Sequence, residues 1–269
     1  MDRFGPSTLV EAGEHRILID CGRGATQRLF QRDTPLGSVE MVLFTHLHSD
    51  HVTGFPDFWL TGWLFGRTQP LRVWGPSGTS AMIRNLERAY AFDLHMRRID
   101  DGMPAAGAKI VAQDSAGGVV VNTPDGLRIT AFLVDHGPVK PAFGYRVEYG
   151  GYVAVFSGDT RPSDNLVKHA KGADVLVHEV LAPEVERRRA KIDPHAIEHV
   201  IARHTTAEEA GKLFARIGPR LAVFSHIAPS VTSEADVLPD VRKNYDGRVA
   251  FGADRMAIRI GPEIEVTYP

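Results

Sequence analysis

The feature that most constrains the fold is a cluster of ionisable side chains directly after a short apolar run. The run is Met41-Val-Leu-Phe-Thr45, and His46, His48, Asp50 and His51 follow it. A continuous apolar run of this length is typical of a buried strand. Imidazole and carboxylate groups together suit zinc and similar divalent ions. Because side chains diverge from the loop after a strand, we expect the first two histidines to bind one ion, and Asp50 with His51 to bind a second.

Three later strand-like runs end in residues of the same kind. Leu127–Val134 is followed by Asp135-His136, Tyr152–Phe156 by Ser157-Gly-Asp159, and Leu221–Phe224 by Ser225-His226. The alternative explanation of the first cluster is a solvated histidine-rich loop. Such a loop would not need ligand-type residues elsewhere in the chain, whereas this chain has them at three later strand ends. Four strand ends that carry ligand-type residues therefore predict a metal site.

Composition sets bounds on the class of protein. The chain has 269 residues and 43% hydrophobic content, so it can bury a full core as one domain, residues 1–269. A single cysteine, Cys21, excludes an intramolecular disulfide. The apolar stretches are interrupted and the N-terminus is polar, so we expect no membrane span and a cytoplasmic protein. A formal net charge of −2 gives no general electrostatic attraction to nucleic acid.

The expected secondary structure alternates between strands and helices. Strands are predicted at Ser7–Glu11 and Arg16–Asp20, a long helix at Ser80 to Arg97, and a short helix at Ser163–Lys171. Thr206 and Glu209 form a capping box for a helix that Gly218 ends. This order predicts an α/β fold in which two sheets form a sandwich flanked by helices, with the ligands on loops at one edge.

Further motifs accompany the ligand-bearing runs, and together they indicate a family. They are Asp20–Gln27, Gly66-Arg67, Trp74-Gly-Pro76, Phe143-Gly-Tyr-Arg146, Ser157–Pro162, His178-Glu179 and His204-Thr-Thr206. With these motifs the chain resembles the metallo-β-lactamase-fold hydrolases, in particular the branch of ribonuclease Z and the related arylsulfatase-like enzymes. The resemblance implies a four-layer αβ/βα sandwich formed by a single hydrolase domain.

The resemblance also implies a dinuclear metal site. The implied ligands are His46, His48 and His136 for one ion, Asp50, His51 and His226 for the other, and Asp159 as the bridge. The expected cofactor is two divalent ions, zinc before manganese or iron. Such a pair delivers a metal-bound hydroxide to a phosphorus, sulfur or carbonyl centre. Asp50 is then the candidate to orient or deprotonate the attacking water.

Two further residues are candidates for acid catalysis by the same resemblance. His204 is implied to assist the leaving group, and Glu179 to orient it. Imidazole suits proton donation near neutral pH, and a carboxylate partner favours its charged form. The alternative is that His204 only precedes a helix N-terminus.

The segment Phe55–Phe65 is aromatic and starts shortly after His51. Phe55, Trp59 and Trp63 are therefore candidates for the apolar wall of a substrate pocket. The alternative is a buried helix packed on the sandwich.

The substrate prediction depends on a missing segment. Ribonuclease Z enzymes carry a basic arm that grips transfer RNA between the motifs that correspond to Phe143–Arg146 and Ser157–Thr160. Here only Val147–Phe156 lies between them, and it holds no lysine or arginine. Because phosphate contacts dominate RNA affinity, we expect a small-molecule ester as partner, no nucleic acid and no membrane. A homodimer is also expected.

The sequence thus favours a dinuclear metal-dependent hydrolase of small esters. Aryl sulfates and phosphodiesters are the leading substrates, followed by lactones and carboxylic esters. The alternative enzyme is a ribonuclease Z-type endonuclease for transfer RNA 3′ processing, in which a basic run, Arg187-Arg-Arg189 with Lys191, replaces the arm. The non-enzyme alternative is a metal-binding protein without catalysis, which would lack Asp50 or Asp159, and both are present.

Overall fold

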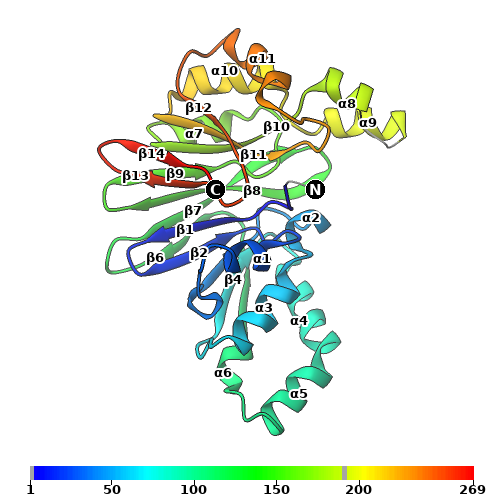
Figure 1. Ribbon diagram of the computed structural model, residues 1–269, viewed down its shortest axis with the longest axis vertical. Helices are drawn as coiled ribbons and strands as arrows, with labels where there is room; N and C mark the ends of the chain where they lie inside the picture. Colours follow the sequence, from blue (N-terminus) through cyan, green and yellow to red (C-terminus); the bar gives the residue numbers. More distant parts are fainter. Residues whose placement is uncertain (1–2, 190–192) are drawn as a thin grey trace. The chain divides into compact units, whose positions relative to one another are not determined.

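The chain forms two compact units, each with its own sheet and its own core. The computed structural model describes residues 3–189 and 193–269. The first unit is Met1–Ala116 and the second is Gly117–Pro269. Figure 1 shows the elements of each unit in their sequence colours.

The first unit contains a five-stranded sheet and its flanking helices. The strand order is β1 (Thr8–Ala12), β2 (His15–Ile19), β3 (Met41–Leu43), β4 (Leu71–Gly75) and β5 (Ile110–Asp114). β1 and β2 are antiparallel, and the other neighbours are parallel. The helices are α1 (Ala25–Phe30), α2 (Ser49–Val52), α3 (Phe55–Leu64), α4 (Thr79–Ala89), α5 (Ala91–Ile99) and α6 (Ala105–Ala108), and a 3₁₀ turn covers Leu36–Ser38.

The core of the first unit fixes the loop that follows β3. Val42 and Phe44 are fully buried and pack with aromatic residues of α3. The ring of Phe44 meets that of Phe55 edge-on, with centroids 5.4 Å apart. This packing anchors the chain immediately before the histidine-rich loop.

The three aromatic residues predicted to form a pocket wall are buried within the first unit. Phe55, Trp59 and Trp63 are each 0% exposed. The indole N–H of Trp59 donates to the carbonyl of Ala108 at 2.7 Å, and that of Trp63 donates to the carbonyl of Pro104 at 2.9 Å. The pocket prediction is therefore corrected, because these aromatic side chains are enclosed within the unit and their polar atoms are already satisfied.

The long helix predicted from Ser80 to Arg97 is two helices. α4 ends and α5 begins at Tyr90, whose backbone leaves the helical region at φ −101° and ψ 13°. α4 buries Thr79 and Ile83, whereas no residue of α5 is buried. The break lets α4 remain packed while the chain changes direction, an outcome that the apolar spacing alone does not reveal.

The second unit contains a seven-stranded sheet and a separate hairpin. The sheet order is β12 (Val249–Phe251), β11 (Leu221–Ile227), β10 (Val175–Val180), β9 (Tyr152–Phe156), β8 (Val139–Tyr149), β7 (Arg128–His136) and β6 (Gly118–Asn122). Strands β9 to β12 pair in parallel, and β6 to β9 pair antiparallel. β13 (Ala257–Ile260) and β14 (Ile264–Thr267) form the hairpin. The helices are α7 (Asp164–Ala170), α8 (Pro183–Arg189), α9 (Pro194–Ile201), α10 (Ala207–Ile217) and α11 (Leu238–Arg242), and a 3₁₀ turn covers Glu234–Asp236.

Both faces of this sheet are covered, as its alternating side chains require. Ala222 and Phe224 of β11 pack against α7, α10 and α11, which lie on one face (Figure 1). Leu221 and Val223 point the other way and pack with Ile264 of β14. Because successive strand residues face opposite sides, one short strand contributes to two apolar layers and its end is held firmly.

The helix ends in this unit agree with the sequence. The Thr206 side chain and Glu209 form the predicted capping box of α10, and Gly218 ends this helix with φ 66°. In this left-handed conformation glycine has no side chain to clash. The predicted strand Tyr152–Phe156 coincides with β9. Within the described ranges, no helix combines the length and apolar character needed to cross a bilayer.

The segment in place of the transfer RNA arm is a tight hairpin. β8 and β9 pair as far as Tyr149 and Tyr152, so only Gly150 and Gly151 form the turn. Both glycines have positive φ, 56° and 83°. A two-residue hairpin with this backbone favours glycine. The expected short connection is therefore confirmed.

Candidate active site

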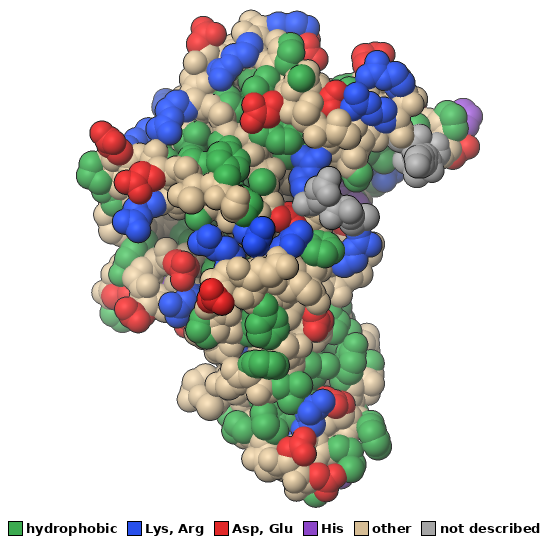
Figure 2. All heavy atoms as spheres, viewed as in Figure 1, with side chains coloured by type: hydrophobic (Ala, Val, Ile, Leu, Met, Phe, Trp, Pro, Cys, Tyr) green, Lys and Arg blue, Asp and Glu red, His purple; other side chains and the backbone are tan. Residues whose placement is uncertain are grey.

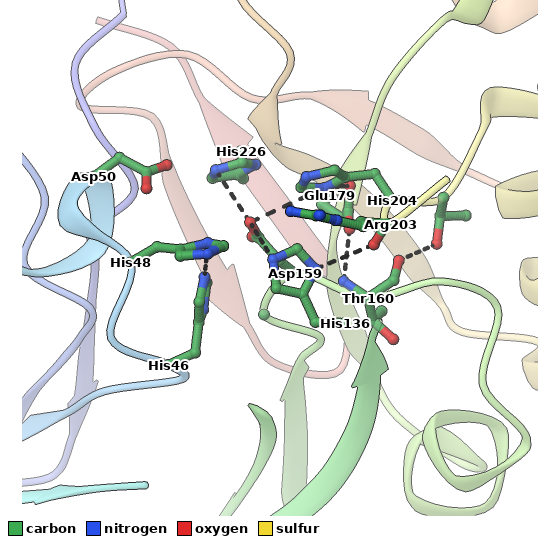
Figure 3. A network of polar contacts seen from close by, with 12 residues as sticks. His46, His48, Asp50, His136, Asp159, Thr160, Glu179, Arg203, His204 and His226 are labelled. Carbon is green, nitrogen blue, oxygen red and sulfur yellow. Dashed lines mark hydrogen bonds and ion pairs between the residues drawn. The ribbon is translucent and has the colours of Figure 1, made fainter. Parts of the chain in front are cut away.

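The histidine-rich loop of the first unit gathers its four ligand-type residues in one cluster. Nε2 of His46 lies 2.9 Å from Nδ1 of His48 (Figure 3). Nε2 of His51 lies 3.7 Å from Oδ2 of Asp50. α2 begins directly after His48, so Asp50 and His51 start on a helical turn while His46 and His48 remain on the preceding loop. The ring of His46 also lies against that of His51, with centroids 4.0 Å apart, so the four residues form one cluster and their division between two ions stays a prediction.

A buried carboxylate orients His51, and the sequence assigned it no role. Asp20 is 4% exposed, and its Oδ2 lies 2.8 Å from Nδ1 of His51. The backbone N–H and hydroxyl of Thr45 both donate to the same carboxylate at 2.8 Å. With Nδ1–H donated to Asp20, Nε2 keeps the lone pair that a metal needs. The signal that could have indicated this role is an aspartate at the end of an apolar strand.

We expect Asp20→Ala to weaken metal binding without removing a ligand. Loss of a carboxylate that orients a metal-binding histidine typically costs about 10–100-fold in metal affinity or activity. Titration of the bound metal with a competing chelator measures the change. Asp33→Ala is the matched control, because Asp33 is exposed but shares the left-handed backbone of Asp20, with φ 52° against 57°. Equal metal affinity in the two variants would contradict the orienting role.

In the second unit, the carboxylate of Asp159 lies between the side chains of His136 and His226. Its Oδ2 lies 3.5 Å from Nε2 of His226 and 3.9 Å from Nε2 of His136 (Figure 3). These distances exceed ordinary hydrogen bonds. Two ligands of one tetrahedral zinc ion, each bound at about 2.0–2.2 Å, stand about 3.3–3.6 Å apart. The donor types and the shorter of these separations therefore fit a divalent metal, and the longer one is close to this range.

His136 is held in the tautomer that a ligand requires. It lies at the end of β7 and is 1% exposed. Its Nδ1 donates to the carbonyl of Arg203 at 3.1 Å. Because a carbonyl only accepts, the proton is on Nδ1, and Nε2 offers its lone pair towards Asp159.

His204 and Glu179 form a hydrogen-bonded pair beside Asp159. Nδ1 of His204 lies 2.8 Å from Oε2 of Glu179, and Oε1 of Glu179 accepts from the backbone N–H of Thr160 at 2.6 Å. Burial raises the pKa of the Glu179 carboxyl, and the hydrogen bond from His204 acts in the opposite direction. Donor atoms of Asp159, His204 and His226 all lie within 4.8 Å of one another. His204 is therefore placed either to act as an acid or to serve as a further ligand.

Comparisons with known proteins identify the family. Residues 15–227 match the family described as "Beta-lactamase superfamily domain". A ribonuclease Z of Mycobacterium bovis is 31% identical over 266 residues, which cover 97% of this chain and 94% of the relative. A ribonuclease Z of Mycolicibacterium paratuberculosis is 33% identical over 264 residues, with 96% and 93% covered.

Solved structures agree on the fold. The short form of human tRNase Z has a TM-score of 0.67 at 22% identity and covers 94% of this chain and 91% of its own. The metallo-β-lactamase fold protein YhfI of Bacillus subtilis also has a TM-score of 0.67, at 17% identity with 99% and 93% covered. The chain belongs to the β-lactamase superfamily, in its ribonuclease Z branch, and is a metal-dependent hydrolase that uses a divalent metal. The predicted fold class is confirmed.

The substrate prediction is wrong. Relatives that align over almost the whole chain are named Ribonuclease Z, which contradicts a small-molecule ester as partner and the exclusion of nucleic acid. The comparisons give no support to the arylsulfatase-like side of the branch. The error lies in the inference from the missing arm. The 266 aligned positions already span 97% of this chain, so the M. bovis relative has room for only a few extra residues and no long arm at this place.

Proposed function

We propose that this protein is an endoribonuclease of the ribonuclease Z type, which hydrolyses a phosphodiester bond near the 3′ end of transfer RNA precursors. The observation that carries the proposal is the similarity, 31% identity over 97% of the chain, to a protein named Ribonuclease Z. The name of the human structure adds transfer RNA as the class of nucleic acid. The geometry within each unit supports the chemistry.

The proposed metal ligands are those that the family resemblance implies. They are His46, His48 and His136 for one ion, Asp50, His51 and His226 for the other, and Asp159 for both. The distances of 3.5 Å and 3.9 Å from Asp159 to His226 and His136 support Asp159 as the shared ligand. Zinc is the proposed metal, because imidazole and carboxylate ligands suit it. When bound, two divalent ions activate water and stabilise negative charge on phosphoryl oxygens.

The protein's own groups supply the proton transfers in this proposal. Asp50, whose side chain is 53% exposed, orients the attacking water. His204 donates a proton to the leaving oxygen, and its hydrogen bond to Glu179 keeps the ring positioned and favours its charged form. The backbone N–H of Thr160 holds the other oxygen of Glu179, so the carboxylate cannot turn away from His204.

The basic run predicted to replace the arm is largely engaged within the protein. Arg187 hydrogen bonds to Glu184 and Glu198, and Arg189 contacts Asp236. Figure 2 shows blue side chains beside red ones in this region. Lys191 lies outside the described residues. Phosphate binding by Arg187 or Arg189 would therefore require exchange of existing ion pairs, which weakens the case for this run as the RNA-binding surface.

Cleavage of a precursor transfer RNA with a 3′ trailer tests the proposed function. We expect the metal-loaded protein to release the trailer by a single cut, at a rate that falls as salt rises, because RNA binding releases counterions. Gel analysis of end-labelled precursor measures the site and the rate. The mature transfer RNA and a duplex DNA of equal length serve as controls. A protein that holds its metals but leaves the precursor intact would contradict the proposal.

A further inference from the structure

His178 is a buried histidine that the proposed chemistry does not use. It lies on β10 directly before Glu179 and is 1% exposed. Its ring packs edge-on against Phe214 of α10, with centroids 5.7 Å apart. Leu176, two residues earlier on the strand, belongs to the same apolar cluster as Phe214. A polar ring in such a layer costs desolvation that a leucine would avoid, so its two nitrogen atoms need an explanation.

The ring of His178 is neutral and carries its proton on Nδ1. Burial lowers the pKa of His178 to about 4, so only one of its nitrogen atoms is protonated near neutral pH. Nδ1 lies 2.6 Å from the carbonyl oxygen of Glu179, which can only accept a hydrogen bond. Nε2 has no hydrogen-bond partner among the described residues. The hydrogen bond to the carbonyl of Glu179 is therefore what a histidine supplies here and an apolar residue could not.

The backbone of Glu179 lies at an irregularity of the strand and is held on both sides. The register of β10 with β11 shifts between His178 and Val180, so the regular ladder is interrupted at Glu179. The hydroxyl of Ser157, which is 1% exposed, accepts from the backbone N–H of Glu179 at 3.3 Å, and His178 donates to its carbonyl. Irregularities of this kind turn a side chain in a new direction. Two buried side chains therefore fix the point at which β10 turns the side chain of Glu179.

The contacts of the Glu179 carboxylate leave little tolerance for movement of this backbone. Its Oε1 accepts from the backbone N–H of Thr160 at 2.6 Å, and its Oε2 lies 2.8 Å from Nδ1 of His204 (Figure 3). Hydrogen bonds weaken steeply when their distance or angle departs from the preferred values. A rotation of the backbone at Glu179 would displace both oxygens at once. The contact with His204 therefore depends on how firmly this backbone is held.

We propose that His178 is a positioning residue, whose hydrogen bond to the carbonyl of Glu179 fixes the strand irregularity and directs the Glu179 carboxylate towards His204. In this role it acts only through Glu179. The inference rests on the proposed function, since it assigns His178 to the proton donation by His204. The alternative is a histidine that only fills the core, and its replacement by an apolar residue of similar size would then change stability alone.

Cleavage of a precursor transfer RNA by three variants separates these two roles. His178→Leu keeps an apolar side chain and removes the donor, so we expect kcat to fall about tenfold with KM unchanged, as for the loss of one hydrogen bond. His178→Asn should restore most of kcat, because its amide offers an N–H near the position of Nδ1. Phe214→Leu is the matched control, because it disturbs the packing of the same ring and leaves the donor in place. Equal kcat per folded enzyme in His178→Leu and Phe214→Leu would overturn the assignment.

A double-mutant cycle shows whether His178 acts through Glu179. In a Glu179→Gln background, His178→Leu should cause no further loss of kcat, because the carboxylate that it positions is already gone. Residues that act on one another give such non-additive effects, whereas independent residues give additive ones. A second tenfold loss in the double variant would therefore show that His178 does not act through Glu179.

NMR of the metal-loaded protein with ¹⁵N-labelled histidine tests the hydrogen bond without any substrate. In the wild type we expect His178 to be the neutral tautomer with its proton on Nδ1. The Nδ1–H signal of His204 should shift in His178→Leu and not in His178→Asn. A proton on Nε2 of His178 would overturn the assignment, even if His178→Leu fails to fold. If the NMR signals are as expected but the wild type cleaves no precursor, the proposed function is contradicted and the positioning of Glu179 by His178 still stands.

Discussion

Asp159→Ala should remove most of the bound metal and most of the activity together. Asp159 is 2% exposed, and its Oδ2 faces the Nε2 atoms of His136 and His226. It is the proposed ligand shared by both ions, so alanine weakens both sites at once. Loss of a residue that only supports a ligand already costs about 10–100-fold, and a shared ligand should cost more than about 100-fold in precursor cleavage. Elemental analysis and single-turnover cleavage measure the two losses.

The control for this variant removes an exposed carboxylate of the same unit that has no role in the proposed chemistry. Asp164→Ala removes an aspartate of α7 whose side chain is 89% exposed and which pairs with Arg216 of α10. It should retain its metal and its activity. Two bound ions and undiminished cleavage in Asp159→Ala would show that the ligand set is assigned wrongly, whereas loss of metal in both variants would indicate a general loss of folding.

Local sequence patterns predict the structure correctly where one side chain or one turn decides it. The apolar strand β9 and the capping box of Thr206 with Glu209 are examples, because each depends on a few adjacent residues. The break at Tyr90 was not predicted, since the apolar spacing of α4 continues into α5 and only the packing of each helix distinguishes them. Periodicity reports which residues share a face, but it does not report where the chain turns.

The candidate ligands could be found from the sequence, but their supporting residues could not. The residues from His46 to His51 are close together in the sequence, and their residue types alone identify them as candidate metal ligands. Asp20 orients His51 from a position 31 residues away, and the carbonyl of Arg203 orients His136 from 67 residues away. A backbone carbonyl has no signature in the sequence. Such partners become visible only when the fold brings distant strand ends together.

The substrate prediction is wrong because the absence of an arm does not exclude binding of RNA. The turn at Gly150-Gly151 is as short as expected. However, a relative named Ribonuclease Z aligns along 94% of its own length and leaves no room for a long arm there. Affinity for RNA is the sum of many phosphate contacts, so one arm is not a requirement that every enzyme of this branch must meet. The pocket prediction for the aromatic residues of α3 fails for a similar reason. These residues are buried, and a high density of aromatic residues is as typical of a core as of a pocket.

His204→Ala should slow cleavage by about 10²–10⁴-fold while the metal content stays unchanged, as expected for loss of a general acid. The alternative arises from the short distances among Asp159, His204 and His226, which would also allow His204 to be a ligand. Elemental analysis of the variant decides between the two roles, because a ligand variant loses metal. His199→Ala, on the exposed side of α9, is the control and should behave as the wild type.

A substrate with a different leaving group tests directly whether His204 acts as a general acid. When the leaving oxygen of the scissile bond is replaced by sulfur, the departing thiolate is stable without a proton, so a general acid contributes little. His204→Ala should therefore lose far less activity on the sulfur-containing precursor than on the normal one. Glu179→Gln should show the same pattern with a smaller loss, since it keeps His204 but removes the carboxylate at 2.8 Å that favours the charged ring. Equal losses on both precursors would mean that His204 binds the substrate or the metal and does not deliver the proton.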